Sequence, residues 1–266
     1  MLEAFFQSSG NIPGVSRTIR IAAAGDIHAS EATRVALESS FAKVERDADV
    51  ILLAGDLTTH GDPAQARVLA EVCRQLDTPV YAVLGNHDFH EGRSDEVASV
   101  LREVGVIVLE RSASICIVGE TEIGIVGTKG FIGGFPGSSL PDFGEPLLRR
   151  VYAETTEEVA AIERGLQQVS HCDLRVVLLH YSPVVETLAG EPAGIQTFLG
   201  SARLAIPIAE YQPDLVLHGH AHAGTFEGRI GATPVYNVAV HVIGRDFYVL
   251  DLEVSRRQAE IEVEGP

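Results

Sequence analysis

Five apolar runs of strand length, each ending in a small group of polar residues, most constrain the fold of this chain. The runs cover residues 19–24, 50–54, 80–84, 176–179 and 215–217. Strands that are buried on both faces read as continuous apolar runs rather than as alternating patterns. Open α/β sheets bind ligands beyond the carboxyl ends of their strands. The polar groups that follow these runs are therefore expected to converge on one crevice.

Strand and helix patterns alternate through the first hundred residues, in the order 19–25, 31–46, 50–54, 64–76, 80–84 and 94–104. This rhythm is typical of parallel strands joined by helical crossovers. Further strands are predicted at 106–109, 114–119 and 123–126, with a tight turn near Glu120 and Thr121. Helices at about 154–170 and 201–211 precede the last two apolar runs. From residue 225 onward the pattern predicts strand alone, at 225–230, 233–239, 245–253 and 258–264. The fold class is α/β, with two packed sheets.

The chain is organised as one domain. Residues 1–18 are predicted to be a loose leader, because they have neither a basic start nor a sustained apolar core. Residues 19–266 are predicted to form the single domain. Residues 129–146 are rich in Gly, Pro, Ser and Phe and lack periodicity. Loops of that length within a compact domain are usually functional, so 129–150 is interpreted as a possible lid or substrate loop.

Charge and cysteine content narrow the class of protein. The net charge of −17 argues against a broad surface for nucleic acid, which needs many phosphate contacts, but it does not exclude a small phosphorylated substrate. The three cysteines are odd in number and show no CxxC spacing. They are interpreted as free thiols, and the chain is expected to be cytoplasmic. No apolar run approaches the length of a membrane span. The sequence leaves the oligomeric state open.

The polar groups after the apolar runs supply four imidazoles, two carboxylates and an amide. These candidate metal ligands are Asp26, His28, Asp56, Asn86, His180, His220 and His222. Taken singly, each has a plain alternative: Asp56 is a common turn residue, and His180 alone suits a strand end. Their joint order after buried strands favours one metal site. Mixed imidazole and carboxylate ligands suit Mn, Fe, Zn or Co better than Ca or Mg.

The ordered set Asp-x-His, Gly-Asp, Gly-Asn-His-Asp, His and Gly-His-x-His resembles the calcineurin-like metallophosphoesterase family, and it spans residues 26 to 222. The resemblance implies a four-layer α-β-β-α sandwich, in which helices flank two mixed sheets. It also implies two divalent or trivalent transition-metal ions, with Mn, Fe or Zn favoured. By this resemblance one ion is held by Asp26, His28, Asp56 and His222. The second ion shares Asp56 and is held also by Asn86, His180 and His220.

His87 is the catalytic candidate. The resemblance implies that it stabilises the transition state or protonates the leaving oxygen. The alternative is that His87 only supports the ligands. Asp88 either orients His87 or caps the following turn. His60 and His90 are interpreted as exposed loop residues, although they lie near enough to the ligands to contact substrate.

The second motif narrows the branch of the family. Phosphoprotein phosphatases resemble Gly-Asp-x-Val-Asp-Arg-Gly at this motif, and this chain has Gly55-Asp56-Leu57-Thr58-Thr59-His60-Gly61, which lacks that second Asp and the Arg. Thr59 stands where purple acid phosphatases carry a tyrosine. The Gly-Asp-Leu-Thr form is more similar to small bacterial phosphodiesterases. The expected function is hydrolysis of a phosphodiester or nucleotide by attack of a metal-bridging hydroxide. The alternatives are a phosphomonoesterase acting on a small metabolite or nucleotide, a nuclease, and a non-catalytic interaction module.

Overall fold

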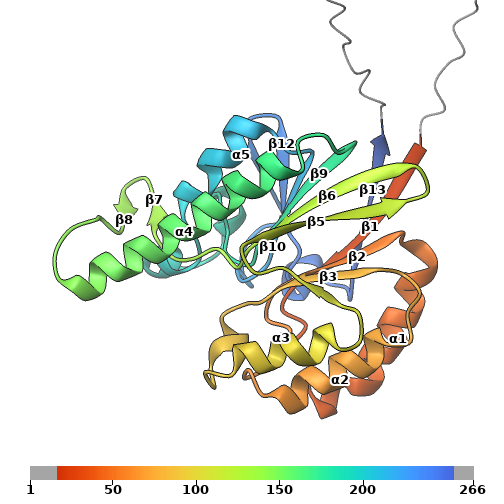
Figure 1. Ribbon diagram of the computed structural model, residues 1–266. Helices are drawn as coiled ribbons and strands as arrows, with labels where there is room; N and C mark the ends of the chain where they lie inside the picture. The colour runs from red at the N-terminus through yellow and green to blue at the C-terminus, as the bar shows by residue number, and fades with distance from the viewer. Residues whose placement is uncertain (1–16, 255–266) are drawn as a thin grey trace, which may run out of the picture.

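The computed structural model describes residues 17–254, and these form the four-layer sandwich that the resemblance implies. Residues 1–16 of the predicted leader and the strand predicted at 258–264 lie outside the described residues. Residues 17 and 18, placed in the leader by the sequence, belong to the first strand. The two ends of the described chain lie side by side, because β1 (Arg17–Ala24) pairs with β13 (Tyr248–Val254) (Figure 1).

The first sheet has the strand order β13-β1-β2-β3-β4. Its remaining strands are β2 (Val50–Ala54), β3 (Val80–Val83) and β4 (Ile107–Val108). β1 to β4 are parallel, and β13 runs antiparallel at the edge. The outer face is covered by α1 (Arg34–Val44), α2 (Pro63–Cys73) and α3 (Ser94–Arg102). α2 begins at a capped turn: the Asp62 side chain accepts from the Ala64 amide at 2.8 Å, and Pro63 occupies the first helical position.

The second sheet has the strand order β11-β12-β10-β9-β6-β5. Its strands are β5 (Ser112–Val118), β6 (Thr121–Gly127), β9 (Leu174–Leu178), β10 (Leu215–His218), β11 (Glu227–Ile230) and β12 (Thr233–Asn237). The four inner strands are parallel and both edge strands are antiparallel. α4 (Pro146–Gln168) and α5 (Ala205–Tyr211) cover its outer face. Gly165 lets α4 lie close to β6, because a Cβ there would lie 2.4 Å from the Val126 side chain.

The core lies between the sheets and under the helices on each side. Ile21, Leu52, Val176 and Leu217 belong to the central layer and are fully buried. The first sheet also packs against α1 to α3, and the second packs against α4 and α5. Both faces of the inner strands are therefore covered, which explains their continuous apolar sequences. All three cysteines are buried and unpaired, as the sequence predicts.

The structure departs from the predicted elements in two places. α4 begins at Pro146, so the last five residues of the predicted 129–150 loop are helical. The rest of that segment contains a small hairpin, β7 (Gly134–Phe135) with β8 (Ser138–Ser139), and it projects with α4 beyond the body of the protein (Figure 1). After residue 225, a short helix, α6 (Val240–Ile243), lies between the strands predicted at 233–239 and 245–253, where no helix was predicted. Short 3-10 helices also occur: η1 (Glu31–Thr33), η2 (Glu45–Asp47), η3 (His87–Phe89), η4 (Glu186–Leu188), η5 (Ala193–Phe198) and η6 (Ala202–Leu204).

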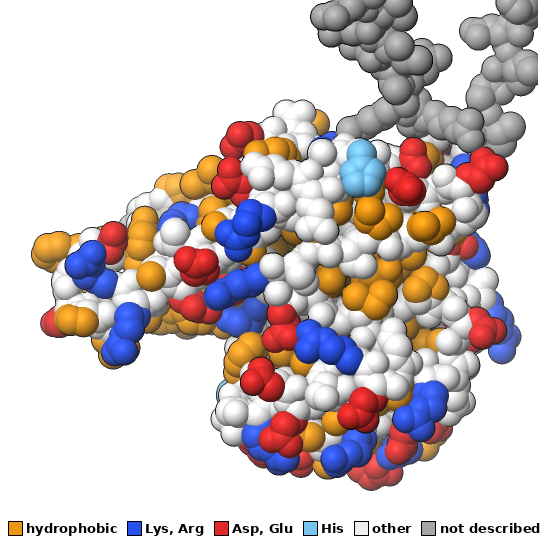
Figure 2. Space-filling view, in the orientation of Figure 1, with side chains coloured by type: hydrophobic (Ala, Val, Ile, Leu, Met, Phe, Trp, Pro, Cys, Tyr) orange, Lys and Arg blue, Asp and Glu red, His pale blue; other side chains and the backbone are white. Residues whose placement is uncertain are grey.

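The surface carries charges of both signs. Figure 2 shows acidic and basic side chains interspersed over the body on the face it presents. Phe143, Leu147 and Leu148 are exposed at the outer end of the projecting segment. Among residues 17–254, no helix is both long and apolar enough to cross a membrane.

Candidate metal centre

The seven candidate ligands lie at the carboxyl ends of five parallel strands drawn from both sheets. β1 leads to Asp26 and His28, β2 to Asp56 and β3 to Asn86; β9 leads to His180, and β10 to His220 and His222. The strand ends meet across the two sheets, since the Gly25 amide donates to Val238 O at 2.8 Å and His180 Nδ1 lies 2.9 Å from Ala54 O. The structure therefore brings together all seven residues that the sequence singles out as candidate ligands.

One group of ligands surrounds the Asp26 carboxylate. Asp26, His28, Asp56 and His222 each offer an atom, and these atoms lie within 4.8 Å of one another. His222 Nε2 lies 2.8 Å from Asp26 Oδ1. Both carboxylates are 1% exposed, whereas the His222 side chain is 39% exposed. The group is thus buried on the carboxylate side and open to solvent on the imidazole side.

A second group lies against the first and shares one of its carboxylates. Asp56, His180 and His220 also offer ligand atoms within 4.8 Å of one another. His180 Nε2 lies 3.4 Å from Asp56 Oδ1 and 2.8 Å from Asn86 Oδ1, so the amide completes this group. Asp56 alone belongs to both groups. That arrangement is what two neighbouring cations need, because one carboxylate can bind both of them.

Hydrogen bonds to backbone carbonyls orient the imidazoles. Nδ1 of His180 lies 2.9 Å from Ala54 O, and Nδ1 of His28 lies 3.3 Å from Thr58 O. Nε2 of His220 lies 3.2 Å from Phe198 O. A ring nitrogen that faces a carbonyl must carry the proton, which leaves the other nitrogen with a lone pair for a metal. His180 and His28 therefore present Nε2, and His220 presents Nδ1.

The backbone at the ligands is strained. Asp26, His28, Asp56 and His220 have φ of 59°, 44°, 50° and 70°, in the left-handed region that non-glycine residues seldom adopt. Each such residue costs on the order of 1 kcal/mol and persists only where its surroundings impose it. Here the Asp26 amide donates to Gly55 O at 3.0 Å, and the His28 amide donates to Asp56 O at 3.1 Å. The sharp bends turn the side chains from the strand ends into the site.

Two glycines allow the strand ends to approach one another. A Cβ on Gly85 would lie 2.2 Å from both the amide nitrogen and Oδ1 of Asp56. A Cβ on Gly219 would lie 2.4 Å from Asp26 Oδ2. Only a residue without a side chain fits at either position, so both carboxylates are held by close backbone packing.

The electrostatics of the ligands follow from burial and from one another. Burial raises the pKa of Asp26, but the hydrogen bond with His222 and the nearby imidazoles outweigh it and lower that pKa to about 2. Burial lowers the pKa of His220 to about 3 and also lowers the pKa of His28. The hydrogen bond to Asp26 raises the pKa of His222. At neutral pH the site therefore presents an ionised carboxylate beside neutral His28 and His220, which is the ligand state that metals require.

His87 projects toward the shared carboxylate from the start of η3. Its amide donates to Asp56 Oδ1 at 2.8 Å, and its Nδ1 lies 2.8 Å from Thr59 O. Its Nε2 lies 3.9 Å from Asp56 Oδ2, and the side chain is 32% exposed. The ring is therefore fixed through Nδ1, while Nε2 faces the open side of the centre.

Asp88 holds the backbone of the neighbouring turns and makes no hydrogen bond to the His87 ring, whose Nδ1 faces Thr59 O instead. Its fully buried carboxylate accepts hydrogen bonds from the amides of Leu57 (3.1 Å), Thr58 (2.8 Å) and Gly85 (2.8 Å), and from the Thr58 hydroxyl (2.6 Å). The carboxylate thus fastens the loop after β2 to the loop after β3. It keeps Asp56 and His87 in register.

Sequence reasoning missed two rings that support the ligands. His241 in α6 stacks on His222, with ring centroids 4.2 Å apart and planes at 15°. The Tyr181 ring packs against His220 at 4.5 Å. Tyr181 directly follows ligand His180, so adjacency could have indicated it. Nothing in the local sequence indicated His241, because α6 is too short to show a helical period and the contact with His222 arises only in the folded chain.

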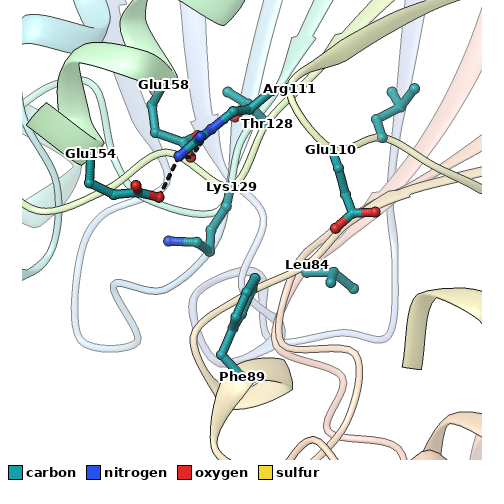
Figure 3. A pocket seen from close by; sticks show the side chains of 9 residues that line it. Leu84, Phe89, Glu110, Arg111, Thr128, Lys129, Glu154 and Glu158 are labelled. Carbon is teal, nitrogen blue, oxygen red and sulfur yellow. Dashed lines mark hydrogen bonds and ion pairs between the residues drawn. The ribbon is translucent and has the colours of Figure 1, made fainter. Parts of the chain in front are cut away.

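A cavity of about 300 Å³ opens beside the centre, between the end of β3, the end of β6 and α4. Leu84, Phe89, Glu110, Arg111, Thr128, Lys129, Glu154 and Glu158 line it (Figure 3). Arg111 pairs with Glu158 at 2.9 Å and also with Glu154. The cavity adjoins the ligands through the backbone, because the His180 amide donates to Lys129 O at 3.0 Å.

The cavity is lined by two cations, Arg111 and Lys129. Arg111 is held by its ion pairs with Glu154 and Glu158, whereas the Lys129 amine extends into the cavity (Figure 3). The Lys129 Nζ donates to Gly130 O at 3.2 Å and lies 4.2 Å from the centre of the Phe131 ring and 5.4 Å from that of Phe89. Burial lowers the pKa of Lys129. Figure 3 shows the amine extending between α4 and Phe89. Such an amine is suited to hydrogen-bond a ligand in the cavity.

Comparisons with known proteins agree with this geometry. The profile of the calcineurin-like phosphoesterase family matches residues 19–224. A probable cyclic nucleotide phosphodiesterase of Synechococcus sp. is 25% identical over 236 residues, which is 83% of this chain and 75% of that protein.

Two solved structures share the fold. The crystal structure of the phosphopantetheinyl hydrolase of Mycobacterium tuberculosis superposes with a TM-score of 0.64 at 17% identity, covering 84% of this chain and 89% of that one. The TT1561 protein of Thermus thermophilus superposes with a TM-score of 0.53 at 19% identity, covering 90% and 100%.

Proposed function

The chain belongs to the calcineurin-like phosphoesterase family, and we propose that it hydrolyses a phosphodiester or nucleotide at a centre for two metal ions. As a family member it is a metal-dependent phosphoric ester hydrolase. The position of Asp56 in both ligand groups is the observation that carries the two-ion proposal. The similarity to a probable cyclic nucleotide phosphodiesterase supports the diester preference.

The donor set fits two transition-metal ions. One ion would take Asp26, His28, Asp56 and His222, and the other would take Asp56 with the three remaining ligands, Asn86, His180 and His220. Each ion would take two imidazole nitrogens and two oxygens, and this mixed set favours Mn, Fe or Zn over Mg or Ca. Ions bound there supply Lewis acidity, which lowers the pKa of a water and neutralises charge on the phosphate oxygens.

His87 is proposed as the proton donor to the leaving oxygen. Thr59 O fixes the Nδ1 proton, so a protonated ring would present its second proton at Nε2 toward the substrate. Transfer of that proton to the departing oxygen would leave the product as an alcohol and His87 as a neutral ring. The hydrogen bond from the His87 amide to Asp56 holds this donor in place relative to both metal groups.

The cavity beside the centre has room for one ring system of a substrate, such as a nucleobase or a sugar. Its volume of about 300 Å³ lies at the lower end of small-molecule sites. Phe89 offers a face for stacking, Lys129 offers a donor and Glu110 offers an acceptor. These groups suit a nucleoside or a similar polar ring, which we propose enters here while its phosphate lies at the ligands.

The test is hydrolysis of bis(p-nitrophenyl) phosphate beside p-nitrophenyl phosphate, on metal-stripped protein before and after reloading with Mn²⁺. The proposal expects release from the diester that depends on Mn²⁺ and exceeds release from the monoester. Asp56→Asn should abolish it. His171→Ala, which changes an exposed histidine beside Glu122, should leave it unchanged. A preference for the monoester would reassign the protein as a phosphomonoesterase, and full activity of Asp56→Asn would refute the two-ion centre.

A further inference from the structure

Three histidines form a separate group at the rim of the metal centre. His60 lies in the loop after β2, His87 begins η3 and His90 follows that helix. One ring nitrogen from each lies within 4.8 Å of the others. The His87 and His90 rings have centroids 4.7 Å apart, and the nearly parallel rings of His60 and His90 have centroids 6.4 Å apart. His60 and His90 are exposed, so ions in solution can reach the group.

The backbone holds these histidines in place. His87 and His90 are three residues apart on a 3-10 turn, where side chains at that spacing eclipse, and the His90 amide donates to His87 O at 3.2 Å. The His60 amide donates to the Gln65 side chain at 2.9 Å. Gly61 has a φ of +77°, and a Cβ there would lie 2.7 Å from Asp88 O, so the His60 loop rests directly on the η3 backbone. Because the backbone is fixed, the three imidazole rings need only rotate about their side-chain bonds to surround an ion.

The chemistry of the group selects the ion. A tetrahedral zinc with Zn–N bonds of about 2.0–2.1 Å needs nitrogens roughly 3.4 Å apart. The three ring nitrogens already lie within 4.8 Å of one another, so small side-chain rotations bring them to that spacing. Three imidazoles with an open fourth position favour borderline ions such as Zn²⁺, Ni²⁺ and Cu²⁺ over Mg²⁺ or Ca²⁺. The net charge of −17 adds a general attraction for cations.

We propose that His60, His87 and His90 form a third site, which binds a divalent transition-metal ion such as Zn²⁺ and inhibits the enzyme. His87 belongs both to this group and to the proposed proton donor, and it cannot serve an ion and a leaving oxygen at once. Excess Zn²⁺ would therefore withdraw His87 from the reaction. The binding stands on the histidine geometry alone, whereas the inhibition rests on the proposed function.

The test is zinc binding by the full chain, measured by native mass spectrometry and by competition with a chromophoric chelator. The double substitution of His60→Ala with His90→Ala should remove one zinc per chain. The affinity of the double variant for a third zinc ion should be at least about tenfold lower than that of the wild-type protein, since loss of even an outer-shell partner weakens metal binding by about that much. His171→Ala is the matched control, because it disrupts the Glu122–His171–Cys172 group, which is another source of a weak zinc.

Activity gives the second readout. Zinc beyond the two-ion complement should inhibit diester hydrolysis by the wild-type protein, while the double variant should keep its activity at the same zinc concentration. Equal zinc stoichiometry in the wild-type protein and the double variant would overturn the site, as would loss of the weak zinc in His171→Ala instead. A third zinc without inhibition would overturn the regulatory role. If the protein hydrolyses neither ester, the stoichiometry still decides whether the site exists.

Discussion

Gly85→Ala tests whether the position of the Asp56 carboxylate controls activity. The added Cβ would lie 2.2 Å from the amide nitrogen and from Oδ1 of Asp56, whereas ordinary van der Waals contact begins near 3.4 Å. Asp56 or the β3 end must therefore move by about 1.2 Å. The contacted atoms include backbone, so rotation of a flexible side chain cannot relieve the clash. Metal sites tolerate deviations in ligand distance of only about 0.2 Å.

The expected loss follows from that displacement. A misplacement of about 1 Å costs roughly a hundredfold in rate, which corresponds to about 2.7 kcal/mol in activation free energy. We therefore expect kcat for bis(p-nitrophenyl) phosphate to fall about a hundredfold and the metal content to fall with it. Overpacking should also lower the free energy of unfolding by about 1–3 kcal/mol.

The assay compares diester hydrolysis, metal content and urea unfolding of Gly85→Ala with those of Gly194→Ala. Gly194 has no atom within 4 Å of an added Cβ, so this control should behave as wild type. If folded Gly85→Ala keeps its metal and its rate within about threefold of wild type, close packing against Gly85 does not control the position of the Asp56 carboxylate.

Three further predictions concern single residues. In protein loaded with two Mn²⁺ ions per chain, His87→Ala should lower kcat for the diester by about 10²–10⁴ and leave those two ions bound, since a general acid contributes about that much. An unchanged kcat would exclude His87 as proton donor. In the metal-stripped protein, the pKa of Asp26 is depressed to about 2, so its ionised form stabilises the fold above about pH 4 and this contribution is lost as pH falls through about 2. Urea unfolding should show wild type losing on the order of 2 kcal/mol more than Asp26→Asn over that range, and equal losses would contradict the assignment. Lys129→Met should raise KM for a nucleotide substrate about tenfold with kcat nearly unchanged, because a charged hydrogen-bond donor contributes roughly 1.5 kcal/mol; a loss confined to kcat would place Lys129 in the chemical step instead.

The sequence predicted the parts of the site that depend on strand ends. β2 and β3 are buried on both faces, so their apolar runs end where the sheet ends, and the next polar residue lies at the crevice. The spacing of Asp26 and His28 could be read directly from the chain. The left-handed backbone at both residues could not, because it depends on hydrogen bonds to the loop after β2.

Features that depend on contacts between distant parts of the chain could not be predicted from the sequence. Asp88 could be read as a turn residue or as a partner of His87, and only contacts with the Leu57 and Thr58 amides, about thirty positions away, decide between them. The start of α4 was hidden because Leu147 and Leu148 are exposed and show no buried periodicity. α6 falls between the strands predicted at 233–239 and 245–253, where the sequence predicted no element, because a four-residue helix has no period to detect.

The histidine group at the rim shows the same limit. His60 and His90 are thirty residues apart and were each interpreted as exposed loop residues, which they are. Their closeness to each other and to His87 results from the loop after β2 resting on η3 through Gly61 and the Asp88 carboxylate. Neither contact follows from local sequence.

Anomalous X-ray diffraction from crystals of the Mn²⁺-loaded protein would test the shared-carboxylate centre most directly. If two ions bind as proposed, the anomalous map should contain two manganese peaks about 3.5–4 Å apart, with the Asp56 carboxylate bound to both. A single peak, or two ions that do not share Asp56, would contradict the shared-carboxylate centre.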